Sequence, residues 1–317
     1  MTATDAQDTP QSTAAAVAQR LYGFRPTAVT RFASENNHVF RVDFGGLPAK
    51  VVKLPGRVAS LLREQRVVRS VRFTRWGMRV PAIEFTQEDL PERDASDAAW
   101  ERPAAVTVMR CEPGLLLADA VLRDEPWAGD AMRAAGAFAA QLGEVPPMRL
   151  GRARRSQPPE QVERSLRWVQ PPLEAFQLGQ LSPLLEEVGR MKARPAVSLA
   201  HGEYYPANLL ARAAAGGAQI CVLDWETARP GFALQDLASL LGALVDLPLR
   251  DDGRCAWLRR RAIEGFDALH PLSGSHVREL AAWEAFGLLS AARFHLDAGR
   301  VERARRLARQ AAIVYDS

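Results

Sequence analysis

The sequence predicts an α+β protein with a strand-rich N-terminal part and a mainly helical C-terminal part. Short β-branched runs separated by polar turns dominate up to about residue 112, Pro113-Gly114 then breaks the chain, and the pattern after it has helical spacing. The 317 residues are enough for two lobes. We therefore expect a disordered tail over 1–12, an N-terminal lobe over 13–112 and a helical C-terminal lobe over 113–317.

The strand-rich part begins with a helix and an antiparallel meander. The helix is expected at Ala14–Tyr22, and the three strands of the meander at 28–32, 39–44 and 49–54. The elements expected after the meander are a helix at 58–71, strands at 80–85 and 104–109, and between these two strands an exposed acidic loop at 86–103. The basic stretch 152–159 contains proline and is predicted to link two helices.

Composition excludes several classes of protein. Hydrophobic residues make up 47% and charged residues 25%, and the net charge is +4, which is too mild and too dispersed to favour nucleic acid as a partner. Cys111, Cys221 and Cys255 form neither a disulfide framework nor a zinc pattern, as is typical of a reducing compartment. The polar N-terminus and the absence of a long apolar run predict no secretory signal and no membrane span. We expect a cytoplasmic protein.

A lysine and a glutamate in the N-terminal part are predicted to pair. Lys53 lies in the third strand of the meander, and Glu64 lies on the following helix. Glu64 shares one helical face with Leu61, Val68 and Val71, where a carboxylate is costly unless a cation neutralises it. Lys53 is the natural partner, since it is on the preceding strand.

The segment from His201 to Leu210 carries the most specific pattern in the chain. Glu203 precedes Asn208 by five residues, and Asp224 follows an apolar run after the pair Gly216-Gly217. A Gly-Gly pair between two apolar runs predicts a hairpin, and folding at that turn brings Asn208 and Asp224 close together. Oxygen-bearing side chains from a loop and two strand ends thus converge, as phosphoryl transfer with Mg²⁺ requires.

This pattern resembles the aminoglycoside phosphotransferase and choline kinase family of small-molecule kinases. The matching residues are His201-Gly202-Glu203, Asn208, Asp224-Trp225-Glu226, Gly231 and Asp236-Leu237-Ala238. The resemblance implies a bilobal protein-kinase-like fold and transfer of the γ-phosphate of ATP or GTP to a hydroxyl of a small molecule. In one respect the chain departs from the family, which usually has Asp where this chain has Glu203, and the extra methylene displaces the carboxylate by about 1 to 1.5 Å.

The resemblance also implies a role for each matched residue. Glu203 takes the catalytic-base position, while Asn208 and Asp224 take the Mg²⁺ positions. His201 would brace the loop, and Asp236 would hold it by hydrogen bonds. The residues expected to bind the nucleotide are Lys53, Glu64 and Asn37, together with the interlobe hinge at Met109 and Cys111.

The acceptor and the activity leave alternatives open. From Arg250 to Ser317 there are twelve Arg and nine acidic residues, a balance that disfavours a polycationic aminoglycoside and favours a neutral or partly apolar hydroxyl compound. Glu203 and the glycine-free turn at 34–37 also fit a nucleotide-binding pseudokinase that regulates a partner. The absence of an Ala-Pro-Glu segment after Asp224 disfavours a protein kinase.

Overall fold

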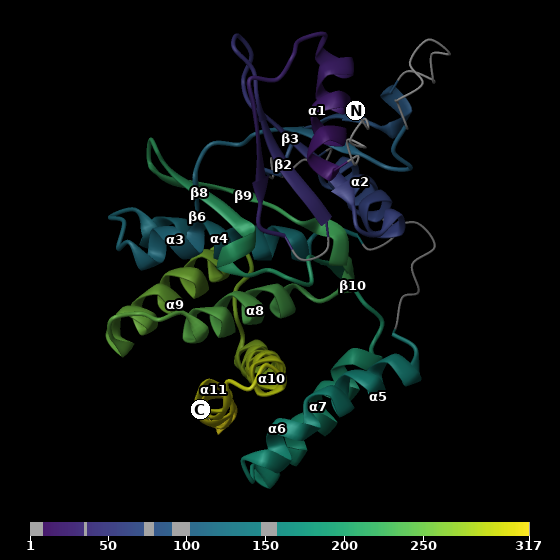
Figure 1. Cartoon of the computed structure of the whole chain (residues 1–317). Coiled ribbons are helices and arrows are strands. Elements are labelled where there is room, and N and C mark those ends of the chain that lie inside the picture. The colour runs from purple at the N-terminus through teal and green to yellow at the C-terminus, as the bar shows by residue number, and fades with distance from the viewer. Residues whose placement is uncertain (1–8, 35–36, 73–78, 91–101, 147–156, 317) are drawn as a thin grey trace. The chain divides into compact units, whose positions relative to one another are not determined.

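The computed structural model describes residues 9–34, 37–72, 79–90, 102–146 and 157–316. The chain forms two compact units, with the described residues up to Pro113 in the first and those from Gly114 onward in the second. Figure 1 shows the strands of the first unit and the helices that make up most of the second. The α+β class expected from the sequence, with an antiparallel N-terminal sheet, is confirmed.

The first unit is built on a five-stranded antiparallel sheet in the order β1-β2-β3-β5-β4. Its strands are β1 (Ala28–Phe32), β2 (Asn37–Asp43), β3 (Lys50–Pro55), β4 (Ile83–Thr86) and β5 (Thr107–Arg110), and its helices are α1 (Pro10–Tyr22) and α2 (Val58–Arg72). Phe40, Val52, Leu54 and Val108 pack with α1 residues in one buried cluster. Because side chains alternate along a strand, Lys53 points to the opposite face from Val52 and Leu54.

Some boundaries in the first unit differ from those the sequence predicted. Helix α1 begins at Pro10 and not at Ala14, because the Thr9 hydroxyl caps it and proline suits the first turn. Residues 10–12 therefore belong to a helix and not to a disordered tail, while 1–8 lie outside the described residues. The expected exposed loop 86–103 starts with a short 3-10 turn, Gln87–Asp89, followed by the buried Leu90. Residues 91–101 of that loop, 35–36 of the turn and 152–156 of the linker also lie outside the described part.

The second unit is a helical assembly with short strands. The strands are β6 (Leu115–Leu116), β7 (Ser198–Ala200), β8 (Leu209–Ala214), β9 (Gly217–Val222) and β10 (Arg229–Gly231). The helices are α3 (Leu117–Leu122), α4 (Ala128–Gly143), α5 (Pro159–Trp168), α6 (Gln170–Ala175), α7 (Ser182–Ala193), α8 (Ala233–Asp246), α9 (Asp252–Asp267), α10 (Gly274–Asp297) and α11 (Val301–Asp316). No helix in the described part of the chain is both long and apolar enough to cross a membrane.

The predicted hairpin between Asn208 and Asp224 is present, one residue out of the expected register. Strands β8 and β9 pair antiparallel from Leu209 opposite Val222 to Ala214 opposite Gly217. The two loop residues are thus Ala215 and Gly216, because Gly216 takes the left-handed conformation, with φ of 83°, at the second loop position. As a result Leu223, and not Asp224, lies opposite Asn208, and its N–H donates to the Asn208 carbonyl at 2.9 Å.

Helices α4 and α9 approach each other at backbone distance. A Cβ placed on Gly136 would lie 1.8 Å from the Ala262 carbonyl oxygen, and one on Gly265 would lie 1.8 Å from that of Arg133. Both glycines are therefore required by space, since neither contact can be relieved by turning a flexible side chain. A Cβ placed on Gly287, inside α10, would have no neighbouring atom within 4 Å.

We predict that Gly136→Ala and Gly265→Ala each destabilise the protein by roughly 1–3 kcal/mol or more, because α4 and α9 must separate to admit a methyl group. Gly287→Ala is the matched control. It places the same methyl group in open space in a helix and should be neutral or stabilising by up to about 1 kcal/mol. Urea unfolding of the three variants measures the difference, and equal effects at all three positions would contradict this helix contact.

Candidate functional site

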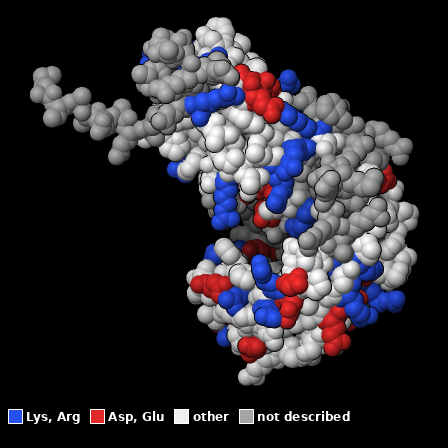
Figure 2. Space-filling view, turned by 90° about the vertical axis from the view of Figure 1, so that its right-hand side faces the viewer, with Lys and Arg blue, Asp and Glu red and all other residues white. Residues whose placement is uncertain are grey.

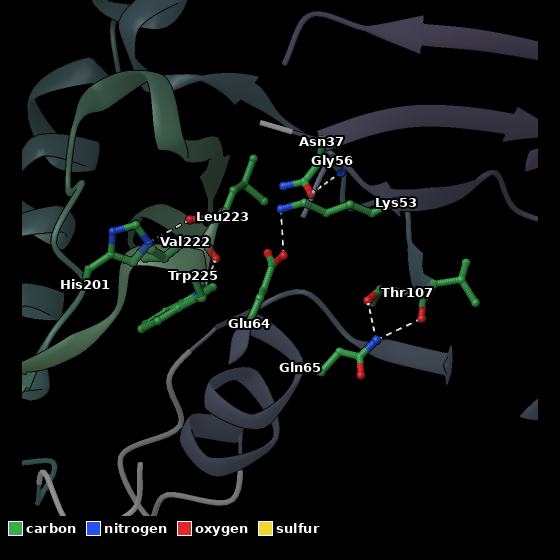
Figure 3. Close-up of polar contacts among 11 residues, drawn as sticks. Asn37, Lys53, Gly56, Glu64, Gln65, Thr107, His201, Val222, Leu223 and Trp225 are labelled. Carbon is green, nitrogen blue, oxygen red and sulfur yellow. Dashed lines mark hydrogen bonds and ion pairs between the residues drawn. The ribbon is translucent and has the colours of Figure 1, made fainter. Parts of the chain in front are cut away.

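The candidate site residues lie in both units, and each half is described by itself. In the first unit, Lys53 Nζ lies 2.6 Å from a carboxylate oxygen of Glu64, and the two side chains are only 5% and 4% exposed. Figure 3 shows the pair, with Lys53 reaching from β3 to Glu64 on α2. This confirms the predicted ion pair. A pair this deeply buried holds its two groups in a defined place, because separating them would leave an uncompensated charge.

A glutamine next to Glu64 fixes the position of helix α2. The Gln65 amide donates to the Val106 carbonyl at 2.8 Å and to the Thr107 hydroxyl at 2.9 Å, and these two acceptors lie on or beside β5 (Figure 3). Gln65 is buried. The sequence analysis did not select Gln65. Its position was informative, because Gln65 is four residues after Leu61 and therefore borders the same apolar face of the helix as Glu64.

Asn37 and the hinge segment make backbone-directed contacts. Asn37 is buried at the start of β2, and its Oδ1 accepts the Gly56 N–H at 3.3 Å (Figure 3). Met109 lies inside the sheet, opposite Val51 on β3. The Cys111 N–H donates to the Ala49 carbonyl at 3.2 Å, so this donor is already engaged within the unit.

In the second unit, the loop from His201 to Asn208 is held from several sides. The Tyr204 hydroxyl donates to the Ala135 carbonyl of α4 at 2.8 Å, and the Thr227 hydroxyl donates to the His201 carbonyl at 3.0 Å. Gly202 has φ of 90°, and a Cβ on it would lie 2.2 Å from an Arg229 nitrogen, so both conformation and space require glycine. The loop is thus fixed by contacts inside its own unit.

His201 connects this loop to the end of β9. Its Nε2 lies 2.8 Å from the Leu223 carbonyl (Figure 3). The Glu203 N–H donates to its Nδ1 at 3.3 Å. Nδ1 accepts and Nε2 donates, so the ring is the neutral Nε2–H tautomer. Burial lowers the pKa of His201 to about 4, although its backbone hydrogen bonds act in the other direction. The predicted bracing role of His201 is confirmed, and the ring is neutral at physiological pH.

Asp236 holds the same loop from helix α8. Its carboxylate accepts the N–H groups of His201 at 2.8 Å and Gly202 at 3.1 Å, as the sequence predicted. The side chain is buried, and burial raises the pKa of Asp236 to about 6, against the opposing effects of the two N–H groups and of Arg229. The carboxylate is therefore ionised at neutral pH and orders two successive residues just before Glu203.

Asp224 has an uncommon backbone conformation. Its φ of 58° and ψ of 65° place it in the left-handed region, which is rare for a residue other than glycine. The flanking residues hold it there: the indole N–H of buried Trp225 donates to the Val222 carbonyl at 2.8 Å, and His201 engages Leu223 (Figure 3). Such conformations cluster at functional sites, where the surrounding structure maintains them.

The residues proposed for metal binding have oxygens suited to it. The amide nitrogen of Asn208 donates to the Glu203 carbonyl at 2.9 Å, which leaves the amide oxygen as an acceptor. Asp224 supplies a carboxylate close by, since its neighbour Leu223 is bonded to Asn208. Among the described residues no group of three or more His, Cys, Asp or Glu forms a metal site. One carboxylate and one amide fit Mg²⁺, which takes its remaining ligands from water and phosphate.

Comparison with known proteins places the chain in a family. The model of the phosphotransferase enzyme family (APH) matches residues 28–275. The chain belongs to this family. No curated protein matches the chain significantly.

Three solved structures of similar fold are small-molecule kinases. An amicoumacin kinase in complex with AMP-PNP, Ca²⁺ and Ami is 16% identical, with a TM-score of 0.64 over 97% of this phosphotransferase and 94% of that chain. The GDP complex of aminoglycoside 2'-phosphotransferase-IIIa is 12% identical, with a TM-score of 0.64 over 96% and 98%. A microcompartment-associated aminopropanol kinase is 16% identical, with a TM-score of 0.58 over 90% and 91%. At these identities the likeness shows the shared kinase-like fold, as expected from the sequence.

Asp236 makes the stability of this phosphotransferase depend on pH. The pKa of this carboxyl is about 6 in the folded protein, above the ordinary value of about 3.9 expected in the unfolded chain. Between about pH 4 and pH 6 the folded state retains this proton while the unfolded state has lost it. The contribution of Asp236 to stability therefore falls as pH rises through this window, by about 3 kcal/mol in total.

We predict that the free energy of unfolding of wild type, relative to Asp236→Asn, decreases as pH rises from 4.5 to 7.5. The Asn variant keeps the size of the side chain but cannot titrate, so the difference between the two proteins isolates this one group. Urea unfolding at four pH values measures it. A difference that stays constant, or grows with pH, would mean that Asp236 does not ionise at a raised pKa.

Proposed function

We propose that this protein transfers the γ-phosphoryl group of ATP or GTP, with Mg²⁺, to a hydroxyl group of a small molecule. The observation that carries the proposal is the loop of Glu203, which Asp236 and His201 hold in place by hydrogen bonds. Asn208, at the end of this loop, is bonded to Leu223, the residue before Asp224. Family membership supports phosphotransfer to a small molecule. The bound AMP-PNP and GDP of the similar kinases support a nucleotide donor.

Lys53 supplies the positive charge for the donor phosphates. Phosphoryl transfer proceeds largely through positioning and electrostatic stabilisation, because charge is spread over the phosphate oxygens in a loose transition state. The ion pair with Glu64 fixes the position of the Lys53 ammonium. The hydrogen bonds of Gln65 to Val106 and Thr107 hold the helix that carries Glu64 against β5. Asn37 would line the turn that covers the phosphates.

The purine edge of the nucleotide is read by backbone groups after β5. Met109 and Cys111 were expected to contribute, but the Cys111 N–H is already donated to Ala49. The N–H of the next residue, Glu112, has no acceptor among the residues that the structure describes. We therefore assign the donor to Glu112 and leave carbonyl groups of the Met109–Cys111 segment as acceptors.

Asp224 and Asn208 would hold Mg²⁺. When bound, the ion neutralises charge on the phosphate oxygens and orients them. The left-handed conformation of Asp224 and the hydrogen bond from the Asn208 amide to Glu203 preset the two oxygen donors before any ion arrives. The same hydrogen bond connects the metal position to the backbone of the proposed base.

Glu203 orients the acceptor hydroxyl and takes its proton. The hydroxyl oxygen forms a bond to the γ-phosphorus, the bond from that phosphorus to the β–γ bridging oxygen breaks, and the nucleoside diphosphate leaves. Glu203 is partly exposed, and its backbone N–H is held by His201. Because the backbone is held on both sides of Glu203, the longer side chain displaces the carboxylate and not the loop.

We predict that Glu203→Gln lowers turnover by roughly 10²–10⁴, because the amide keeps the shape of the side chain but cannot accept a proton. Mg·ATP or Mg·GTP affinity should hardly change. A screen of nucleotide consumption against hydroxylated metabolites and antibiotics first identifies an acceptor, and steady-state kinetics then compares the variants.

Glu203→Asp is the informative control for this prediction. If the acceptor site suits the longer glutamate, the shorter carboxylate also loses activity, since a displacement of about 1 Å already affects positioning. Wild-type turnover by Glu203→Gln would remove Glu203 as the base. Nucleotide binding without turnover of any acceptor would favour the pseudokinase alternative.

We predict that Lys53→Met weakens Mg·ATP or Mg·GTP binding roughly 10- to 100-fold, the equivalent of one lost charge-assisted hydrogen bond. Binding of the nucleoside alone should not change, because Lys53 faces only the phosphates. Titration calorimetry with nucleotide and nucleoside separates the two cases.

Lys50→Met is a closely matched control for Lys53→Met. Lys50 lies on the same strand, is buried and pairs with Glu84 at 2.7 Å, but it points to the opposite face. Both variants should lower the melting temperature, since each removes the nearest cation of a glutamate, although Glu84 keeps a longer contact of 3.8 Å with Arg110. Only Lys53→Met should weaken triphosphate binding, and equal nucleotide affinities in the two variants would refute the assignment.

A further inference from the structure

Tyr205 differs from the other tyrosines of the chain. There are four tyrosines, and all of them belong to the residues that the structure describes. The hydroxyls of Tyr22, Tyr204 and Tyr315 each donate to an oxygen of the protein. The Tyr205 hydroxyl makes no such bond to any described residue, and Tyr205 is 40% exposed. Its ring and its polar end are therefore both available to a ligand.

A tight turn places Tyr205 beside the proposed base. The Tyr205 N–H donates to the Glu203 carbonyl at 2.9 Å, which closes a three-residue turn with Tyr204 in the middle. The Tyr204 side chain is fully buried and bonded to α4, so the middle residue of the turn points into the unit. Glu203 and Tyr205 flank it and are both accessible to solvent. An acceptor whose hydroxyl is held by Glu203 would thus have the Tyr205 side chain close by.

The backbone on both sides of the Tyr205 side chain is fixed. Its carbonyl accepts the Asn208 N–H at 2.8 Å, and the next residue is the buried Pro206, whose ring restricts the chain. Burial, and to a smaller extent the charge of Glu203, raise the pKa of Tyr205, so its hydroxyl remains a hydrogen-bond donor at neutral pH. A tyrosine has only two side-chain torsions, so little conformational entropy is lost when a ligand contacts it. The exposed ring is therefore a preorganised contact surface.

Charge and exposure indicate what such a surface would bind. In the described part of the face shown in Figure 2, Asp and Glu side chains stand in small groups among Lys and Arg, with no broad acidic area to attract a polycation. Single exposed apolar side chains are common on proteins, so exposure alone does not make Tyr205 a binding residue. Its combination of an exposed ring, an unused hydroxyl and a place next to Glu203 does distinguish it.

We propose that Tyr205 determines the specificity for the acceptor by binding its body while Glu203 holds the reacting hydroxyl. The Tyr205 ring packs on a cyclic, apolar part of the acceptor, and the Tyr205 hydroxyl donates a hydrogen bond to another oxygen of the same molecule. The inference rests on the proposed function, since it takes Glu203 as the base. It narrows the expected acceptor from a neutral or partly apolar hydroxyl compound to an alcohol built on a ring.

Binding of small alcohols tests the ring contact without turnover. The probes are benzyl alcohol and cyclohexylmethanol, which contain a ring, and glycerol, which does not. Ligand-observed NMR measures their affinities for the protein loaded with Mg²⁺ and a non-hydrolysable ATP or GTP analogue. We expect both ring alcohols to bind more tightly than glycerol, and Tyr205→Ala to weaken them roughly 3- to 10-fold, the size of one aromatic contact. Tyr205→Phe keeps the ring and should bind them like wild type. Equal affinities in wild type and Tyr205→Ala would overturn the proposal.

Phe294→Leu is the matched control, because it removes another exposed ring from the same unit. Phe294 is 54% exposed on α10, and its neighbour His295 is bonded to Asp246. Asp246 ends α8 and lies ten residues, or about 15 Å of helix, beyond Asp236, which holds the loop of Tyr205. Phe294→Leu should therefore bind the ring alcohols like wild type. A loss equal to that of Tyr205→Ala would mean that the alcohols contact exposed rings in general, and the assignment to Tyr205 would fail.

Kinetics with an acceptor from the nucleotide-consumption screen tests the role of Tyr205 in the reaction. Tyr205→Ala should raise the KM of the acceptor roughly 10- to 100-fold and leave kcat and the KM of the nucleotide nearly unchanged, because a contact with the body of the acceptor is the same in the ground and transition states. Tyr205→Phe should raise the same KM roughly 2- to 10-fold, through loss of one hydrogen bond. A lower kcat at unchanged KM would mean that Tyr205 acts through the loop of Glu203 and not by contact with the acceptor.

The two proposals can fail separately. Binding of ring alcohols that depends on Tyr205, without turnover of any acceptor, would support the contact and count against the kinase. Turnover of an acceptor whose KM is the same in wild type and Tyr205→Ala would support the kinase and overturn the role of Tyr205.

Discussion

The carboxylate of Asp236 orders the backbone on which the candidate site depends. It accepts two successive N–H groups, at His201 and Gly202, and a side chain that accepts two adjacent backbone donors fixes the direction of the chain between them. Glu203 is the next residue, so its position follows from this contact. Burial of the carboxylate opposes its ionisation, yet the ionised form makes both bonds. The protein thus retains a costly buried charge where it needs an ordered loop.

His201 connects this ordered loop to Leu223, which follows strand β9. Because burial keeps its ring neutral, each ring nitrogen has one defined role: Nδ1 accepts from Glu203, and Nε2–H donates to Leu223. The position of the proposed base and that of the proposed metal ligand Asp224 are therefore linked by a single side chain. A protonated imidazole could not accept from Glu203 and would break the link.

The sequence predicted those parts of the site that follow from a costly or highly specific pattern. A carboxylate in an apolar helical stripe required a cation, and the Lys53–Glu64 pair is present. The hairpin was predicted one residue out of register, because the Gly-Gly pair did not reveal which glycine would take the left-handed loop position.

Other features of the structure were missed for different reasons. The start of α1 was missed because Thr9 and Pro10 appear in a polar stretch typical of disorder, although threonine before proline is also a helix start. The backbone contact of α4 with α9 depends on which helix faces meet, and a single sequence does not specify that.

The contact between α4 and α9 also affects the loop that carries Glu203. Gly136 adjoins Ala135, whose carbonyl accepts the hydroxyl of Tyr204, the residue after Glu203. A substitution that separates α4 from α9 would move the Ala135 carbonyl and with it Tyr204. Glu203, the residue before Tyr204, would then move although no residue of its own loop had been changed. Substitutions that change how α4 packs on α9 are therefore expected to lower turnover, although they lie far along the chain from the loop of Glu203.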